Sequence, residues 1–198
     1  MSIKINPRKI TGKWQDGYAL DQHTTGSTFI GHDSFGNPQF DTSRTPLGEL
    51  LYQLKYRSDP KSIELIATVV AEFLRQWKPS VDSLIPVPPS NTTRKQQPVF
   101  DLAKATSERC GITLCENCIT KVKRTAQLKN IYEYQKRISA LEEAFAVERS
   151  ITGGKRILVF DDLYRSGATL NVIAEKLLKE GGAKAVFVLA LTRTRSKL

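Results

Sequence analysis

The sequence predicts an α/β fold in which a mainly parallel sheet is flanked by helices. Residues 157–160 are apolar without alternation, as expected of a strand that is buried on both faces of a parallel sheet. Apolar residues then recur at helical spacing over residues 170–178, and two glycines at 181 and 182 give a helix stop. Residues 185–191 form a second apolar run. This order of strand, helix and strand predicts a βαβ unit.

Residues 1–46 differ in composition from the rest and predict a small N-terminal β element. Aromatic side chains are interspersed there with Gly, Asp, Thr and Asn, and Phe35-Gly36-Asn37-Pro38 is typical of a turn between short antiparallel strands. Residues 47–198 are then expected to form one α/β domain.

The elements between these two regions alternate between helix and strand. Pro46 is expected to begin a helix that runs to Arg57, and a second helix is expected over residues 63–77. Residues 83–89 predict a short strand that runs into a proline-stiffened loop. A further helix over residues 100–109 should end before Gly111.

Composition limits the class of protein. The chain has 198 residues, of which 40% are hydrophobic, which is enough for a sizeable core. No run approaches the eighteen or so apolar residues of a membrane span, and the N-terminus lacks the apolar stretch of a signal peptide, so we expect a cytoplasmic protein without a membrane partner. The net charge is +10, and it is concentrated in residues 1–13, residues 121–137 and the C-terminal tail. Such clusters suit a polyanion, either nucleic acid or a diphosphate.

The three cysteines lie close together in the sequence. Cys115 and Cys118 have the spacing of a zinc half-site, but no second Cys or His pair follows at a suitable distance. We therefore expect Cys110, Cys115 and Cys118 to be buried or idle thiols in a reducing compartment.

Candidate binding residues follow the apolar run 157–160. The segment from Ser166 to Thr169 opens the predicted helix, so unpaired backbone N–H groups and the helix dipole should form an anion site there. Gly167 lets the backbone approach a ligand closely. Asp161 and Asp162 precede this loop, and carboxylates suit sugar hydroxyls or a hydrated divalent metal. Together these groups predict a site for ribose 5-phosphate.

Residues 157–169 resemble the phosphoribosyl-diphosphate (PRPP) motif of type I phosphoribosyltransferases. The resemblance implies a type I phosphoribosyltransferase fold. It also implies that Asp161 and Asp162 hold the ribose 2- and 3-hydroxyls. The following loop would hold the 5-phosphate, through Arg165, Ser166, Gly167, Ala168 and Thr169. Arg165 departs from the motif, which usually has Thr or Ser at this position.

Further segments resemble the ComF group, which are competence-associated phosphoribosyltransferase-like proteins. In chain order they are Leu84-Ile85-Pro86-Val87-Pro88, Arg94, Leu102-Ala103, Arg124-Thr125-x-Gln127, Arg137, Phe145-x-Val147 and Leu191-Thr192-Arg193-Thr194. Two features differ from that group. Its members often carry an N-terminal four-cysteine zinc module, whereas residues 1–46 contain no cysteine, and they tend to have Arg-Gly-Phe-Asn-Gln where this chain has Arg94-Lys95-Gln96-Gln97-Pro98.

The resemblance implies a reaction as well as a fold. A nitrogen nucleophile would displace pyrophosphate from C1 of PRPP, with Mg²⁺ as cofactor and basic side chains stabilising the departing diphosphate. The magnesium ion would be held through PRPP and through Asp161 or Asp162. Pro88, Ser90 and Arg94 would face the diphosphate from the proline-containing loop. Arg124, as a catalytic residue, and Lys129 would belong to a mobile hood over the reacting centre.

Other interpretations stay open from sequence alone. The acid pair could be an N-cap beside a solvated acid, and the proline loop and the basic segment 121–137 could be ordinary solvated surface. A second hypothesis for function is a non-catalytic PRPP- or nucleotide-sensing protein, or a DNA-processing protein of the competence type, that binds nucleic acid through its basic surface. The nitrogen acceptor is not named by the sequence, and a homodimer is one open oligomeric state.

Overall fold

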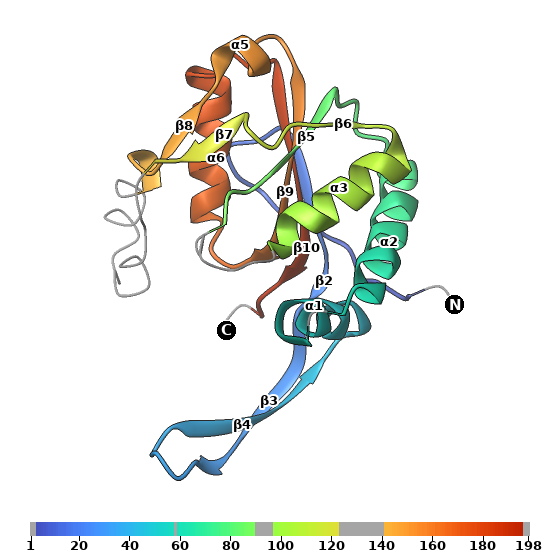
Figure 1. The fold of residues 1–198 in the computed structure, drawn as a ribbon, viewed down its shortest axis with the longest axis vertical. Helices are drawn as coiled ribbons and strands as arrows, with labels where there is room; N and C mark the ends of the chain where they lie inside the picture. The colour runs from blue at the N-terminus through green and yellow to red at the C-terminus, as the bar shows by residue number, and fades with distance from the viewer. Residues whose placement is uncertain (1–2, 58, 90–96, 123–140, 196–198) are drawn as a thin grey trace.

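The computed structural model describes residues 3–57, 59–89, 97–122 and 141–195. The main sheet is built from β1 (Arg8–Lys9), β2 (Asp16–Gln22), β5 (Ser83–Pro86), β6 (Thr113–Leu114), β9 (Arg156–Tyr164) and β10 (Ala185–Arg193). Two small sheets are formed by β3 (Thr24–His32) with β4 (Pro38–Arg44), and by β7 (Ile119–Lys121) with β8 (Phe145–Val147). The helices are α1 (Pro46–Arg57), α2 (Lys61–Trp77), α3 (Pro98–Cys110), α5 (Arg149–Thr152) and α6 (Ala168–Lys179) (Figure 1).

The six-stranded sheet confirms the predicted α/β class. Its strand order is β1-β2-β10-β9-β5-β6, and every neighbouring pair is parallel except β1 with β2. The predicted βαβ unit is the crossover from β9 through α6 to β10, whose strands pair from Arg156 with Ala185 to Tyr164 with Arg193. Parallel strands need such a crossover, and helices then cover both faces of the sheet.

The core lies on both faces of the sheet, because successive side chains of a strand point to opposite sides. Ile157 and Val159 pack into the cluster that includes the buried residues of α6. Leu158 and Phe160 pack into the other cluster, which includes buried apolar residues from α1, α2 and α3. All four side chains have no exposed surface. Figure 1 shows α6 on one side of the strands and α2 with α3 on the other.

The main sheet crosses the predicted boundary at residue 46. Among the described residues before α1, the regular elements are the strands β1 to β4, and β3 and β4 form the expected antiparallel hairpin. β2, however, runs parallel to β10 as a member of the main sheet, which differs from the purely antiparallel element that composition indicated. The division into residues 1–46 and 47–198 stays a prediction about folding units.

β9 is longer than the sequence indicated. A loop was expected directly after the acid pair Asp161 and Asp162, but the strand continues to Tyr164. The reason is the length of β10, which supplies a partner for each further step, with Ala190 opposite Asp161 and Thr192 opposite Leu163. The two acids therefore lie within a paired strand, beyond the end of β5 at Pro86.

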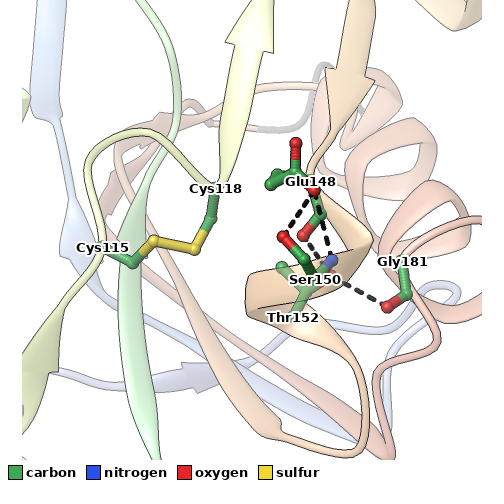
Figure 2. Close-up of a disulfide and its surroundings, with 6 residues drawn as sticks. All are labelled: Cys115, Cys118, Glu148, Ser150, Thr152 and Gly181. Atoms are coloured by element: carbon green, nitrogen blue, oxygen red, sulfur yellow. Dashed lines mark hydrogen bonds between the residues drawn. A yellow bond between two sulfur atoms is a disulfide. The ribbon is translucent and has the colours of Figure 1, made fainter.

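Two of the cysteines are joined, so the expectation of idle thiols was wrong for them. A disulfide links Cys115 and Cys118 across the bend between β6 and β7, with the Cα atoms 5.7 Å apart (Figure 2). This separation is in the ordinary range for a disulfide. Nearby, the Glu148 side chain caps α5 by accepting from the Ser150 amide, and the Thr152 hydroxyl bonds to the Gly181 carbonyl oxygen (2.9 Å). Cys110 is free and half-buried, and burial raises the pKa of its thiol.

The start of α1 is locked onto the end of β2. The Thr45 hydroxyl donates to the Gln22 carbonyl oxygen (2.6 Å) and accepts from the Gly48 amide (3.0 Å). Gly48 is buried, and a Cβ atom built there would lie 2.1 Å from the carbonyl oxygen of His23. Only glycine therefore lets α1 lie this close to the strand. Of the described helices, none is both long enough and apolar enough to cross a membrane.

Gly48→Ala should lower the free energy of unfolding by about 1–3 kcal/mol, because the new methyl group collides with backbone that cannot move cheaply. In a free helix the same change would raise stability by roughly 0.5–1 kcal/mol, so the sign itself is informative. Urea denaturation measures the difference. Gly26→Ala is the matched control, since a Cβ atom there meets nothing within 4 Å. A Gly48→Ala protein as stable as the parent would contradict the close contact.

Candidate functional site

The predicted site lies at the carboxyl edge of the parallel strands. Asp161 and Asp162 are the sixth and seventh of the nine residues of β9. Thr192 is the last but one residue of the neighbouring strand β10, and His23 directly follows β2, which pairs with the far side of β10. On the other side of β9, the Val87 amide donates to the Phe160 carbonyl oxygen (2.9 Å), so the proline loop starts beside the acids. Ligands of open α/β sheets bind at this edge.

The two carboxylates point to opposite faces of the sheet, because they are consecutive residues of a strand. Asp161 continues the series of Ile157 and Val159, which faces α6. Asp162 continues the series of Leu158 and Phe160, which faces α1. Sequence reasoning treated the acids as one pair, whereas the fold gives each a different environment.

Asp162 is paired with Lys55 of α1. Lys55 Nζ lies 2.5 Å from Asp162 Oδ2, and their side chains are 19% and 16% exposed. An ion pair so removed from water is sensitive to the loss of one partner, because the remaining charge is left without compensation. One acid of the predicted ribose site is thus already engaged by a cation from the helix that follows the N-terminal strands.

The Asp161 carboxyl group accepts a hydrogen bond from the backbone of the next residue. Its Oδ1 accepts from the Asp162 amide at 2.8 Å. Burial, and then the negative charge of Asp162, raise the pKa of Asp161, and the Asp162 amide, Lys55 and the Leu163 amide oppose the rise. Desolvation disfavours the charged form of a carboxyl group, so this setting favours the protonated form of Asp161 more than an exposed position would.

A chain of hydrogen bonds connects His23 to the acids. The Thr192 hydroxyl donates to the Asp162 carbonyl oxygen (3.1 Å), and His23 Nδ1 lies 3.1 Å from the same hydroxyl. Since a hydroxyl has one proton to donate, Nδ1 is the donor to Thr192, which leaves Nε2 as the acceptor of the neutral ring. Burial, followed by the charges of Lys55 and Arg44, lowers the pKa of His23 and so favours that neutral ring.

Gly167 lies in the loop that was predicted to bind an anion. Gly167 has φ +73° and precedes the first residue of α6, with no side chain capping the helix. The Asn171 amide makes the first bond of the helix, to the Gly167 carbonyl oxygen (2.8 Å), so the amides of residues 168–170 have no acceptor within the helix. A Cβ atom at Gly167 would lie 2.9 Å from the Tyr164 hydroxyl oxygen and 3.0–3.2 Å from carbon atoms of its ring. Glycine thus satisfies both the backbone conformation and the contact.

The remaining predicted residues are placed as follows. Arg165 and Ser166 are exposed in the loop, Ala168 is buried at the start of α6, and Thr169 is half-buried on its first turn. Pro88 is buried just beyond β5. Ser90, Arg94, Arg124 and Lys129 lie outside the described residues.

Lys55 and His23 were missed by sequence reasoning as site residues. A signal for Lys55 was present, because it follows Leu47 and Leu51 at four-residue spacing, and both leucines are fully buried. A lysine on the apolar stripe of a helix needs an anionic partner. No comparable signal marks His23, whose place at the edge depends on the parallel pairing of β2 with β10.

Removing the carboxyl group of Asp161 should change how stability depends on pH. Because the pKa is raised in the folded protein from its usual 3.8, the folded state binds more protons than the unfolded state above that pH. The free energy of unfolding therefore falls as pH rises through the window between the two pKa values, by at most about 1.4 kcal/mol per pH unit for one proton.

Asp161→Asn should lose this pH-dependent contribution to the free energy of unfolding. In urea titrations from about pH 5 to pH 8, the free energy of unfolding of the variant minus that of the parent protein should therefore increase with pH. Asp41→Asn makes the same chemical change at an exposed position of β4, away from the site, and is the matched control. A constant difference between parent and Asp161→Asn across this range would show that Asp161 is ionised in the folded protein.

Comparison with curated proteins finds one sequence relative. Over 152 residues the chain is 27% identical to competence protein ComFC of Streptococcus pneumoniae, covering 77% of this chain and 66% of that protein. The match thus spans slightly less than two thirds of the relative's length. No family model matches the chain.

Solved structures with a similar fold include phosphoribosyltransferases. Adenine phosphoribosyltransferase from Saccharomyces cerevisiae has a TM-score of 0.45 at 14% identity, with 83% of each chain covered. The enzyme from Leishmania tarentolae has a TM-score of 0.45 at 12% identity, with 95% and 94% covered. Glutamine PRPP amidotransferase from B. subtilis has a TM-score of 0.47 at 18% identity, with 87% of this chain and 36% of that chain covered.

The fold assignment rests on the strands of this chain, since each of these TM-scores is below 0.5. The predicted resemblance to the ComF group is confirmed by the sequence match. The chain is a sequence homologue of ComFC, built as an α/β protein whose mainly parallel six-stranded sheet lies between layers of helices.

Proposed function

We propose that this protein binds PRPP at the carboxyl edge of the sheet and transfers its phosphoribosyl group to a nitrogen nucleophile. The observation that supports this most is the position of Asp161. Its carboxyl group lies on the α6 face of β9, and the open amides at the start of α6 follow a few residues later. A hydroxyl acceptor and a phosphate site on the same face suit a ribose 5-phosphate group.

The 5-phosphate is assigned to the loop of residues 165–169. Backbone N–H groups at a helix start and the helix dipole favour an anion there, and the exposed side chains of Arg165 and Ser166 add donors. Arg165 has a planar set of N–H donors that suits a phosphate group. The departure from the usual Thr or Ser at this position is thus compatible with phosphate binding.

The ribose is assigned mainly to Asp161. Asp162 is turned toward α1 and is neutralised by Lys55, so it acts on the ribose only if that ion pair opens. We therefore propose separate roles, with Asp161 as the hydroxyl acceptor and the Lys55–Asp162 pair as the element that positions β9. This refines the expectation that both acids serve the sugar equally.

The reaction that fits this site is a substitution at C1. The bond from C1 to the diphosphate oxygen breaks with its electron pair on the diphosphate, the bond from nitrogen to C1 forms, and the nitrogen releases a proton. Pro88, with Ser90 and Arg94 after it, is assigned to the diphosphate side, and Arg124 and Lys129 are assigned to the hood. Asp161 stays in contact with the ribose as positive charge develops there, and its negative charge stabilises that change.

The described carboxylates fit a magnesium ion that is shared with the substrate. Magnesium commonly uses one or two protein carboxylates together with substrate phosphates and water. Within residues 3–57, 59–89, 97–122 and 141–195 no group of three or more His, Cys, Asp or Glu side chains could form a protein-only metal site. Asp161 or Asp162 would hold the ion, which when bound neutralises charge on the diphosphate.

A second candidate is a binding protein without turnover. The Lys55–Asp162 pair favours it, because one of the two acids is occupied before any ligand arrives. The net charge of +10 would then serve a polyanionic partner such as nucleic acid. Measuring pyrophosphate release from PRPP with a panel of nitrogenous bases and amines separates the candidates, because only the transferase releases pyrophosphate in an acceptor-dependent way.

Calorimetric titration of the protein with PRPP, in the presence of Mg²⁺, should show binding. Added ribose 5-phosphate should compete with PRPP and reduce this binding. Asp161→Asn should weaken this binding by roughly tenfold or more, because charge-assisted hydrogen bonds of about 1.5–3 kcal/mol are lost. Asp162→Asn should weaken it less, but should lower the free energy of unfolding, because Lys55 is left without its partner.

The exposed Asp41 provides the matched control, and Asp41→Asn should leave both affinity and stability unchanged. Absence of any heat with PRPP would sink the proposal. Equal losses of affinity in Asp161→Asn and Asp162→Asn would instead overturn the separate roles of the acids while preserving the site.

A further inference from the structure

The β3–β4 hairpin projects away from the rest of the molecule and carries an apolar surface. Figure 1 shows it extending as a long arm beyond α1. Of the large apolar side chains that are exposed in the described residues, four lie on this arm: Phe29 (51%), Ile30 (65%), Phe35 (88%) and Phe40 (53%). The site at the carboxyl edge of the sheet uses none of them.

Two of the phenylalanines form one face. Phe29 and Phe40 are directly opposite in the antiparallel register, so both side chains are on the same side of the hairpin. Their ring centroids are 5.6 Å apart, and the His32 ring lies 5.1 Å from that of Phe29 on the same side. Ile30 is the extra residue of a register shift, and Phe35 is in the turn. We call Phe29, Ile30, Phe35 and Phe40 the hairpin patch.

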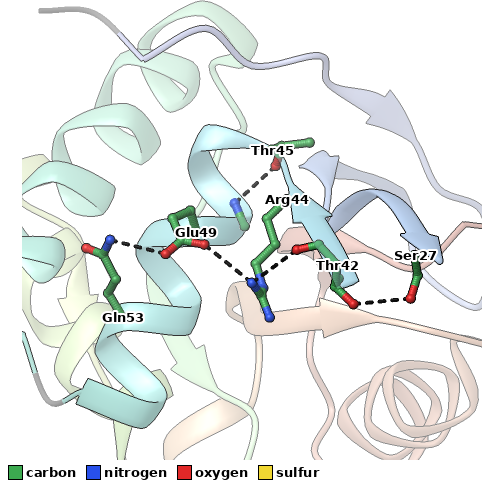
Figure 3. Close-up of polar contacts among 7 residues, drawn as sticks. Ser27, Thr42, Arg44, Thr45, Glu49 and Gln53 are labelled. Carbon is green, nitrogen blue, oxygen red and sulfur yellow. Dashed lines mark hydrogen bonds and ion pairs between the residues drawn. The ribbon is translucent and has the colours of Figure 1, made fainter. Parts of the chain in front are cut away.

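The base of the arm is firmly attached, so its orientation is defined. Arg44 Nη1 lies 3.5 Å from Glu49 Oε2 on α1 (Figure 3). The guanidinium carbon of Arg44 also lies 3.8 Å from the centre of the Tyr52 ring. The hydroxyl groups of Ser27 and Thr42 are 3.1 Å apart across the two strands. Polar contacts thus hold the base, while the apolar side chains lie toward the tip.

A two-stranded hairpin whose aromatic face is not covered by other residues is only marginally stable in water. Packing against a further layer or strand normally stabilises such a hairpin. The free edge of β3 is an unsuitable place for that addition, because register shifts at Thr24/Gly26 and Phe29/Gly31 interrupt the strand, and such irregularities discourage edge pairing. The aromatic face remains as the surface that a partner would cover.

We propose that the hairpin patch is a dimer interface, in which the arms of two copies of this chain pack face to face about a two-fold axis. An isologous contact needs a surface that is complementary to itself, and paired aromatic rings meet this requirement because they pack edge to face against one another. Each copy would contribute the same patch, so the assembly would be limited to a dimer.

Charge favours a second copy over a nucleic acid at this position. Residues 24–44 contain Asp33 and Asp41 against Arg44 alone, in a chain with a net charge of +10. β3 contains no Lys, Arg, Asp or Glu. Two copies of a strongly basic chain repel each other least where the positive charge is missing, whereas a polyanion would be repelled by the two acids.

The available area fits a reversible dimer. The four side chains of the patch offer roughly 500 Å² per copy, given their exposed fractions and about 150–250 Å² for a whole aromatic side chain. A standard interface buries about 800 Å² per partner, so the polar residues beside the patch would supply the remainder. We expect dissociation in the micromolar range rather than an obligate dimer.

Sedimentation equilibrium of the full chain over about 1–300 µM should show a monomer–dimer equilibrium. Phe29→Thr with Phe40→Thr should weaken it by roughly 100-fold or more, since four rings leave the interface while the β-branched residues keep the strands. Leu65→Gln removes an apolar side chain of α2 that is 45% exposed, and this matched control should leave the equilibrium unchanged.

If the double variant unfolds, Phe35→Ser is the alternative test. Phe35 lies outside both strands, so its replacement should weaken the dimer without disturbing the strands. Hydrogen exchange of the unmodified chain gives an independent measure, and amides of residues 24–44 should become more protected as protein concentration rises. A chain that stays monomeric over the whole range overturns the proposal, as does a dimer that Phe35→Ser and the double variant leave equally strong. Loss of binding to a labelled single-stranded oligonucleotide in the hairpin variants of a monomeric protein would assign the patch to nucleic acid instead.

Discussion

Strand β9 packs against helices on both faces of the sheet, because its odd- and even-numbered residues point to opposite faces. Ile157 and Val159 fill the core on the α6 side, and Leu158 and Phe160 fill the core below α1, α2 and α3. The same alternation continues past the core into Asp161 and Asp162. The different surroundings of the two acids are therefore a consequence of core packing, and the site inherits its geometry from the sheet.

The first helix links the N-terminal strands to this site. Thr45 fastens α1 to the end of β2, Gly48 allows the close approach, and Lys55 reaches Asp162 from the last turn of the helix. His23 and Thr192 add a second connection through hydrogen bonds. Residues that are far apart in sequence thus converge on the acids, so the N-terminal region contributes to the site as well as to the fold.

Local patterns were enough to predict much of this architecture. The unbroken apolar run before Asp161, the periodic run after Thr169 and the glycine between them predicted the βαβ unit and the loop that joins β9 to α6. The features that were missed depend on distant partners. The extra length of β9 requires β10, the ion pair of Asp162 requires α1, and the parallel pairing of β2 requires the completed sheet. A single sequence carries no direct record of such pairings.

The place of β2 also determines how this chain can be divided. β10 has eight buried residues among its nine, and β2 pairs with it along most of that length. A fragment that began at residue 47 would keep the acids, the loop before α6 and the helices, but it would expose the flank of a long apolar strand with unpaired backbone groups. Such an edge recruits other chains, so the fragment would tend to aggregate. The N-terminal strand thus acts as a built-in cover for the sheet, and shortened versions of this protein should retain it.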